Sequence, residues 1–188
     1  MGTSPYEVAG VSLSIVAVWL TTRENPWCWP VGFVSLGPFV VLFYQARLYA
    51  DMVLQVVYML VCLYGWYQWL HGGPGHGALP VSRTSRRARV ALAATGTIFA
   101  VLLGLVLRRH TDASLPFWDS STASFSLVAQ WMQARKWIEN WAVWIVVDVV
   151  YVGMYVYKRL YLLAGLYAVF IALAVLGLAQ WRKSLAAR

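Results

Sequence analysis

The sequence predicts an all-α integral membrane protein with seven transmembrane helices. Of its 188 residues, 61% are hydrophobic and only 12% are charged, whereas a soluble domain carries about a quarter charged residues. The apolar runs are about 17–22 residues long, the length of a membrane-spanning helix rather than of a strand in a membrane β-barrel. No polar stretch is long enough for a separate soluble domain, so we expect residues 1–188 to form a single membrane domain.

The expected spans follow one another with short loops between them, and they cover about residues 6–20, 27–44, 50–70, 88–107, 118–134, 139–157 and 160–181. In the second span Pro30 suits the first helical turn, while Gly37 and Pro38 predict a kink that could act as a hinge. A Gly- and Arg-rich linker precedes the fourth span, which is almost featureless. The fifth is rich in serine, so we expect it to be buried among other helices.

The orientation follows from the distribution of basic residues, because cytoplasmic loops carry an excess of Lys and Arg. The side of the membrane opposite the N-terminus receives ten basic residues: Arg23, Arg83, Arg86, Arg87, Arg89, Arg135, Lys136, Arg182, Lys183 and Arg188. The N-terminal side receives five: Arg47, Arg108, Arg109, Lys158 and Arg159. We therefore expect the N-terminus outside and the C-terminus in the cytoplasm. The basic loop residues are interpreted as topological signals, not as a nucleic-acid surface.

An internal repeat appears when the chain is shifted by 112 residues against itself. The matched pairs include Ser12 with Ser124, Trp19 with Trp131, Arg23 with Arg135, Trp29 with Trp141, Tyr49 with Tyr161, Gly65 with Gly177, Gln68 with Gln180 and Trp69 with Trp181. We interpret residues 5–70 and 117–182 as two copies of a three-helix unit. Because each unit has an odd number of spans, a linker helix at residues 88–107 is needed to make the copies parallel, as in SWEET transporters. The predicted architecture is 3+1+3.

The sixth span contains the most informative polar residue of the chain, Asp148. At about 100° per residue, Trp141, Trp144, Asp148, Tyr151 and Tyr155 fall on one stripe of a helix. A carboxylate in a bilayer costs roughly 2.5–3.5 kcal/mol on insertion scales, so it normally faces a cavity or a partner. Aromatic faces beside an acid suit a flat, polar, cationic molecule. The first repeat has no counterpart of this stripe beyond Trp29, which favours a ligand site against the sixth span.

Other spans contribute further candidates. Asp51, Gln55, Tyr58 and Cys62 form a stripe on the third span, and Gln130 and Trp131 lie on the fifth. Amide side chains can donate and accept hydrogen bonds, which suits an amide or ribose hydroxyls. The predicted substrate-binding residues are Gln55, Tyr58, Gln130, Trp131, Asn140, Trp141, Trp144, Asp148 and Tyr151.

Structural roles remain open for several of these residues. Gln55 and Gln130 equally suit hydrogen bonds between helices, and Asp51 and Asn140 equally suit helix capping. We interpret Cys28 and Cys62 as packing residues. Tryptophans near span ends are expected to lie at the membrane interface; these are Trp66, Trp69, Trp118, Trp137 and Trp181.

The sequence contains no sign of an enzyme. His71, His76 and His110 lie in loops or at span ends, away from any paired nucleophile, and no His, Cys and Glu cluster suggests a metal. No Walker sequence is present, so we expect neither ATP drive within this chain nor a cofactor.

At the level of motifs the chain resembles the PnuC family of vitamin transporters. The resemblance rests on Trp27-x-Trp29-Pro30, Leu48-Tyr49-Ala50-Asp51-x3-Gln55-x2-Tyr58, Gly65-Trp66-Tyr67-x-Trp69, Leu127-Val128-Ala129-Gln130-Trp131, Ala134-Arg135-Lys136, Glu139-Asn140-Trp141-x2-Trp144-x3-Asp148 and Tyr155-x2-Lys158-x-Leu160-Tyr161. It covers nearly the whole chain except residues 71–87 and the fourth span.

This resemblance implies a SWEET-like homotrimer in the bacterial inner membrane. It implies uptake of nicotinamide riboside by facilitated diffusion, with phosphorylation in the cytoplasm trapping the vitamin. Relatives in the family carry thiamine or riboflavin, so thiamine and riboflavin remain alternative substrates. A non-transporting membrane subunit of a larger importer is the alternative from a different class.

Overall fold

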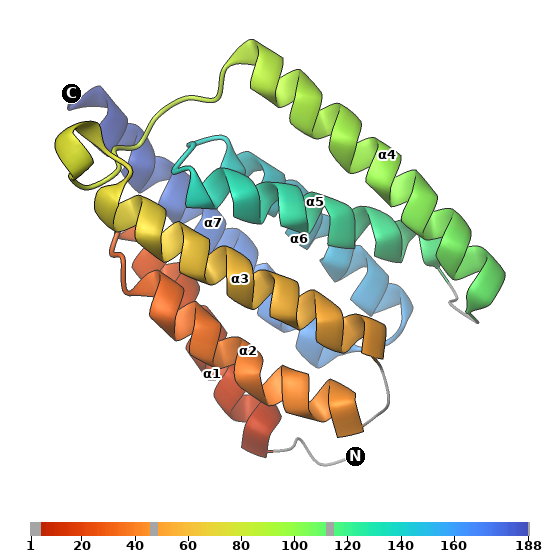
Figure 1. The fold of residues 1–188 in the computed structure, drawn as a ribbon. Coiled ribbons are helices and arrows are strands. Elements are labelled where there is room, and N and C mark those ends of the chain that lie inside the picture. Colours follow the sequence, from red (N-terminus) through yellow and green to blue (C-terminus); the bar gives the residue numbers. More distant parts are fainter. Residues whose placement is uncertain (1–4, 46–48, 112–114, 188) are drawn as a thin grey trace. The chain divides into compact units, whose positions relative to one another are not determined.

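Seven α-helices and one short 3₁₀ helix make up the regular structure of the described residues (Figure 1). The structure is a computed structural model, and it describes residues 5–45, 49–111 and 115–187. In chain order the helices are α1 (Pro5–Thr22), α2 (Cys28–Gln45), α3 (Tyr49–His71), η1 (Pro74–His76), α4 (Arg86–His110), α5 (Pro116–Ala134), α6 (Asn140–Tyr157) and α7 (Tyr161–Ala186). Each α-helix coincides with one expected span to within a few residues, which confirms the all-α fold with seven helices.

Within the described ranges, three helices are long and apolar enough on their own to cross a membrane: α4, α6 and α7. Shorter apolar stretches occupy Ala9–Thr22 of α1 and Cys28–Val41 of α2. Helix α5 falls outside both groups in the described chain, and four of its hydroxyl residues are buried, namely Ser120, Thr122, Ser124 and Ser126. This burial confirms that the serine-rich span is covered by protein.

The chain forms two compact units. The first contains residues 1–81, 134–136 and 179–188, and the second contains residues 82–133 and 137–178. In the first unit α1 packs against α2 and α2 against α3. Cys28 and Cys62 are buried there with free thiols, as expected for packing residues. The limits of the two predicted repeats do not follow from these units and remain a prediction.

In the second unit α4 packs against α5 through a stripe of small residues. Gly96, Ala100 and Gly104 are the buried residues of α4, spaced four apart on one face. A Cβ atom at Gly104 would collide with the Phe117 ring, and the Ser124 hydroxyl donates to the Gly96 carbonyl at 2.6 Å. The absence of glycine's side chain therefore allows close helix contact, as in other membrane helix pairs. Sequence analysis missed this stripe and described the span as featureless.

Local geometry repeats with the predicted 112-residue register. The turn between α1 and α2 and the turn between α5 and α6 each contain a residue in the left-handed region, Glu24 and Lys136, both with φ of 54°. The two turns have matching backbone hydrogen bonds, from Asn25 N to Leu20 O at 3.1 Å and from Trp137 N to Met132 O at 3.0 Å.

Two tryptophans make the same packing contact in the same register. Trp29 packs directly on Gly65 of α3, and Trp141 packs directly on Gly177 of α7. A Cβ atom at either glycine would overlap the indole ring. Both tryptophans are buried, so each Trp and Gly pair brings two helices of its own unit into contact.

Two tryptophans and one lysine near helix ends are buried in the first unit. Trp69 and Trp181 are fully buried there, with ring centroids 5.8 Å apart, and their expected place at the membrane interface stays a prediction. The Trp181 indole also donates to the Thr21 carbonyl at 3.0 Å, which satisfies its polar edge. Lys136 is buried and paired with Glu24 at 3.1 Å, so it has a structural role, and its contribution to membrane topology stays a prediction.

The predicted hinge lies in a continuous helix. Pro38 is inside α2, which runs from Cys28 to Gln45. Space beside Gly37 is open, since a Cβ atom there would have no neighbour within 4 Å. A proline at this position removes one helical hydrogen bond. Bending at Gly37 and Pro38 remains a prediction.

Candidate functional site

Asp148 lies in the middle of α6 and is only 4% exposed. Among the described residues, no hydrogen bond or ion pair holds its carboxyl group. Helix α6 is apolar enough to span a membrane. Burying the Asp148 carboxylate there costs free energy unless a positive or hydrogen-bonding group compensates its charge. Such a carboxyl group is suited to receive a cation that arrives from outside the protein.

Aromatic side chains of α6 and α7 form a cluster that begins one turn after this acid on α6. Tyr151 and Tyr155 stack with centroids 5.8 Å apart, and Tyr167 of α7 lies 4.6 Å from Tyr151 and 5.3 Å from Tyr155. Phe170 meets the Tyr167 ring edge to face at 5.6 Å. Asp148 and Tyr151 are three residues apart on α6, so their side chains lie on the same face of that helix. These rings can attract a flat cation through their faces.

Sequence analysis predicted Tyr151 but missed Tyr167 and Phe170. The 112-residue register contained the signal, because Tyr167 corresponds to Gln55 and Phe170 to Tyr58. Gln55 and Tyr58 are predicted site residues on α3, whereas their counterparts on α7 are not among the predicted residues. In the structure Tyr167 contacts Tyr151 and Tyr155 of the sixth-span stripe, and Phe170 contacts Tyr167.

Hydroxyl groups of α5 complete the polar side of this cluster. The Tyr151 hydroxyl lies within hydrogen-bonding reach of Thr122 and Ser126. Thr122 also donates within its own helix to the carbonyls of Trp118 and Asp119, both at 3.0 Å. The buried hydroxyls of α5 therefore orient the Tyr151 ring beside Asp148.

Trp144 is held by a residue that sequence analysis did not select. Its indole nitrogen donates to the side-chain oxygen of Gln133 at 3.0 Å, and both residues are half-buried. The predicted amide was Gln130, which is half-buried one turn earlier on α5, while the neighbouring Trp131 is 41% exposed. The hydrogen bond fixes the rotation of the Trp144 ring.

Asn140 and Trp141 are fully buried at the start of α6. The Asn140 amide nitrogen donates to the Trp137 carbonyl at 2.6 Å, while its oxygen has no hydrogen-bond partner in the described structure. Trp141 is packed on Gly177. The structure thus shows local contacts for both residues, and their predicted role in binding remains to be tested.

The two candidates from the third span lie on α3 in the other compact unit. Gln55 and Tyr58 are both half-buried. The side chain of Asp51 lies outside the described part of the structure. Within the described ranges, no three His, Cys, Asp or Glu residues cluster as a metal site would require.

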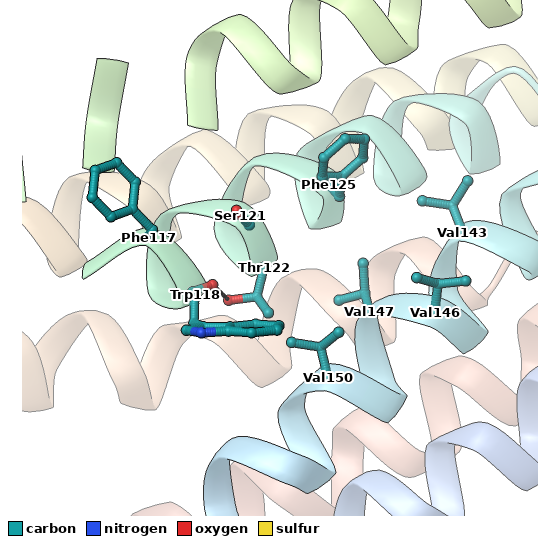
Figure 2. A pocket seen from close by; sticks show the side chains of 9 residues that line it. All are labelled: Phe117, Trp118, Ser121, Thr122, Phe125, Val143, Val146, Val147 and Val150. Atoms are coloured by element: carbon teal, nitrogen blue, oxygen red, sulfur yellow. Dashed lines mark hydrogen bonds between the residues drawn. The ribbon is translucent and has the colours of Figure 1, made fainter. Parts of the chain in front are cut away.

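A separate groove of about 280 Å³ lies between α5 and α6 (Figure 2). Its walls are almost entirely apolar and aromatic, formed by Phe117, Trp118, Ser121, Thr122, Phe125, Val143, Val146, Val147 and Val150. None of the predicted substrate-binding residues lines it. The groove lacks ionisable and amide groups, which distinguishes it from the cluster around Asp148.

Hydrogen bonds join the loop that precedes α4 to the loop that precedes α6. Glu139 accepts hydrogen bonds from the Thr84 backbone at 2.9 Å and from the Thr84 hydroxyl at 2.8 Å. The Ile138 amide donates to the Ser82 carbonyl at 3.0 Å. These contacts fix the first residues of α6 and hence the start of the Asp148 stripe.

Comparisons with known proteins agree with this architecture. The crystal structure of the vitamin B3 transporter PnuC superposes with a TM-score of 0.74 at 20% identity, over 95% of this chain and 80% of that one. This likeness shows the fold.

Sequence relatives extend over most of the chain. The nicotinamide riboside transporter PnuC of Escherichia coli is 26% identical over 95% of this chain and 85% of its own length. The riboflavin/roseoflavin transporter RibM of Streptomyces davaonensis is 31% identical over 93% of this chain and 83% of its own length. Residues 4–183 match the family described as nicotinamide mononucleotide transporter. This chain is therefore a multi-pass membrane protein that belongs to the nicotinamide mononucleotide transporter family.

Proposed function

We propose that this protein takes up nicotinamide riboside by facilitated diffusion, as a uniporter, and that intracellular phosphorylation traps the substrate. The proposal is supported by membership of the family and by the Escherichia coli relative, which is named a nicotinamide riboside transporter. The structural observation that carries it is the buried Asp148 beside the tyrosines of α6 and α7.

The chemistry of the substrate matches this cluster. Nicotinamide riboside has a flat pyridinium ring with a permanent positive charge, an amide and ribose hydroxyls. Asp148 would balance the charge, and the faces of Tyr151, Tyr155 and Tyr167 would attract the ring. Amide and indole groups would bind the polar substituents. We propose that the full set is Gln55, Tyr58, Gln130, Trp131, Asn140, Trp141, Trp144, Asp148 and Tyr151, extended by Tyr167.

The topology and assembly belong to the same proposal. The N-terminus would lie outside and the C-terminus in the cytoplasm of a bacterial inner membrane, following the excess of basic residues on one side. The chain would assemble as a homotrimer. Alternating access would use two parallel three-helix repeats, residues 5–70 and 117–182, joined by a linker helix at 88–107, with bending at Gly37 and Pro38.

Uptake into proteoliposomes tests the function directly. Purified protein is reconstituted without ATP and without an imposed ion gradient, and labelled nicotinamide riboside is added outside. Accumulation to equal concentration on both sides is expected, with acceleration when unlabelled substrate is present on the opposite side. No uptake by a folded sample would contradict the proposal. Uptake by the purified chain alone would also exclude the reading as a non-transporting subunit.

Riboflavin is the second candidate substrate, because the riboflavin/roseoflavin transporter is 31% identical to this chain. Riboflavin is neutral and larger, and it would not need the charge of Asp148. Thiamine is a cation and would use Asp148 as nicotinamide riboside does. Parallel uptake of the three labelled vitamins identifies the substrate.

A further inference from the structure

The groove between α5 and α6 has the shape of a site for an extended chain. On α5 its walls run from Phe117 to Phe125, and on α6 from Val143 to Val150. At 1.5 Å per residue, eight residues of helix span about 12 Å. Figure 2 shows Trp118 beside Val150 and Phe125 on the side of Val143, so the groove follows both helices lengthwise.

The groove opens on a face that is apolar and exposed. Val146 is 63% exposed and Trp118 is 55% exposed. Helix α6 is also apolar enough to span a membrane. The Thr122 hydroxyl already donates to two carbonyls of its own helix. The walls therefore present apolar surface to whatever fills the groove, and in a bilayer the surrounding medium is hydrocarbon.

Two arginines of α4 follow the helix turn that contacts Phe117 at one end of the groove. Phe117 packs on Gly104 of α4, and Arg108 and Arg109 follow one turn later in the last turn of that helix. Both arginines are exposed, and neither forms an ion pair with a described residue. The acid at this end of α5, Asp119, is paired with Lys158 at 3.6 Å. A further acid of the sequence, Asp112, lies outside the described residues.

We propose that this groove binds one acyl chain of an anionic phospholipid, whose phosphate lies against Arg108 and Arg109. Arginine pairs with phosphate through two parallel hydrogen bonds, so two adjacent arginines suit an anionic headgroup. The aromatic ring of Trp118 lines the same end of the groove as Phe117.

A second copy of the protein is a weaker occupant. Nine residues line the groove, whereas a stable interface uses about 20–30 residues on each side. The lining of the groove is apolar along its length, and two arginines follow the turn of α4 that contacts one end of it. A lipid has this same division into an apolar chain and an anionic head.

Native mass spectrometry of the purified full chain tests the proposal, with phosphatidylglycerol and phosphatidylcholine of identical acyl chains as the two probes. We expect the wild type to retain phosphatidylglycerol in preference to phosphatidylcholine. Val146→Trp should fill the groove and remove one retained phosphatidylglycerol per protomer. Val149→Trp is the matched control, because Val149 is 54% exposed on the same helix but does not line the groove.

The headgroup is tested separately with the double substitution Arg108→Gln and Arg109→Gln. This variant should retain the two lipids about equally.

Equal retention of phosphatidylglycerol by the Val146→Trp and Val149→Trp proteins would overturn the proposal. So would equal retention of both lipids by the wild type. If Val146→Trp alone changes the mass of the assembly, the groove is covered by a second copy rather than by lipid. Circular dichroism and gel filtration establish that each variant is folded.

Discussion

Glu24 and Lys136, which stand 112 residues apart in equivalent turns, form an ion pair with each other at 3.1 Å. The lysine ammonium also donates to the Leu79 carbonyl at 3.0 Å and lies 4.7 Å from the centre of the Trp69 ring. Its charge is thus satisfied by a carboxylate, a carbonyl and an aromatic face while its side chain is almost completely buried. The pair links two turns that are distant in sequence within one compact unit.

Removing this lysine should destabilise the protein strongly. Lys136→Met leaves the Glu24 carboxylate partly buried without its partner, which typically costs about 3–5 kcal/mol. The free energy of unfolding can be measured by titration with sodium dodecyl sulfate in mixed micelles. Lys158→Met is the control, because that lysine pairs with Asp119 at the surface, where the cost is about 0–1 kcal/mol. Similar losses in the two variants would show that the buried pair has no special role.

The Trp141 and Gly177 contact should tolerate no added methyl group. Gly177→Ala introduces a Cβ atom into the indole ring, and overpacking of this kind costs about 1–3 kcal/mol. Gly165→Ala in the same helix is the matched control, since no atom lies within 4 Å of its added Cβ. The control should be as stable as the wild type or slightly more stable, because alanine favours helix. Thermal unfolding followed by tryptophan fluorescence compares the two; equal midpoints would contradict the packing argument.

Asp148 should distinguish cationic from neutral substrates. Asp148→Asn retains the shape of the side chain but removes its charge, and a hydrogen bond to a charged group is worth about 1.5–3 kcal/mol. We therefore expect binding of nicotinamide riboside to weaken about tenfold or more, while riboflavin binding changes little. Asp119→Asn serves as control because that acid is paired with Lys158. Unchanged affinity for nicotinamide riboside in Asp148→Asn would remove this residue from the site.

Gln133 should act on the substrate only through Trp144. Gln133→Leu removes the acceptor of the indole hydrogen bond, a contact worth about 0.5–1.5 kcal/mol. The dissociation constant of nicotinamide riboside should rise about twofold to tenfold in this variant. In a Trp144→Phe background, which lacks the indole N–H, the same substitution should have no effect. An equal effect in both backgrounds would mean that Gln133 contributes independently of Trp144.

The proposed hinge predicts a kinetic effect with little change in affinity. Pro38→Ala restores the missing helical hydrogen bond in α2 and should slow transport, while equilibrium binding of nicotinamide riboside stays close to the wild-type value. Pro30→Ala, in the first turn of the same helix, should leave the transport rate unchanged. If both variants transport at the wild-type rate, α2 does not bend at Pro38 during the cycle.

Most of the fold could be predicted from the sequence because long apolar runs determine where membrane helices begin and end. The ends of α5 and α6 at Ala134 and Tyr157 coincide with the expected ones. The burial of individual aromatic residues could not be predicted in this way. Trp69 and Trp66 are three residues apart near the end of α3, but one is buried and the other exposed. The rotation of α3 about its axis determines which of the two tryptophans is buried. The apolar character of the helix does not predict this rotation.

The candidate site was predicted in part for a similar reason. The sixth-span stripe is visible because a charged residue in an apolar run has few interpretations. Tyr167, by contrast, is an aromatic residue in an apolar helix, and only its contacts with Tyr151 and Tyr155 reveal its place. Gln133 was missed because an amide near a helix end is typical of solvent-facing positions. Its significance depends on the side chain that it meets, Trp144.

The glycine stripe of α4 has a consequence for how freely this helix can vary. Gly96, Ala100 and Gly104 are its buried residues, while Ile98, Phe99 and Leu102 are among its exposed ones. Saturation mutagenesis of α4 would therefore give a pattern with a period of four. Almost any apolar residue would be accepted on the outer faces, and only the smallest on the face toward α5. Although the composition of α4 shows no distinctive feature, its small residues determine which helix it packs against.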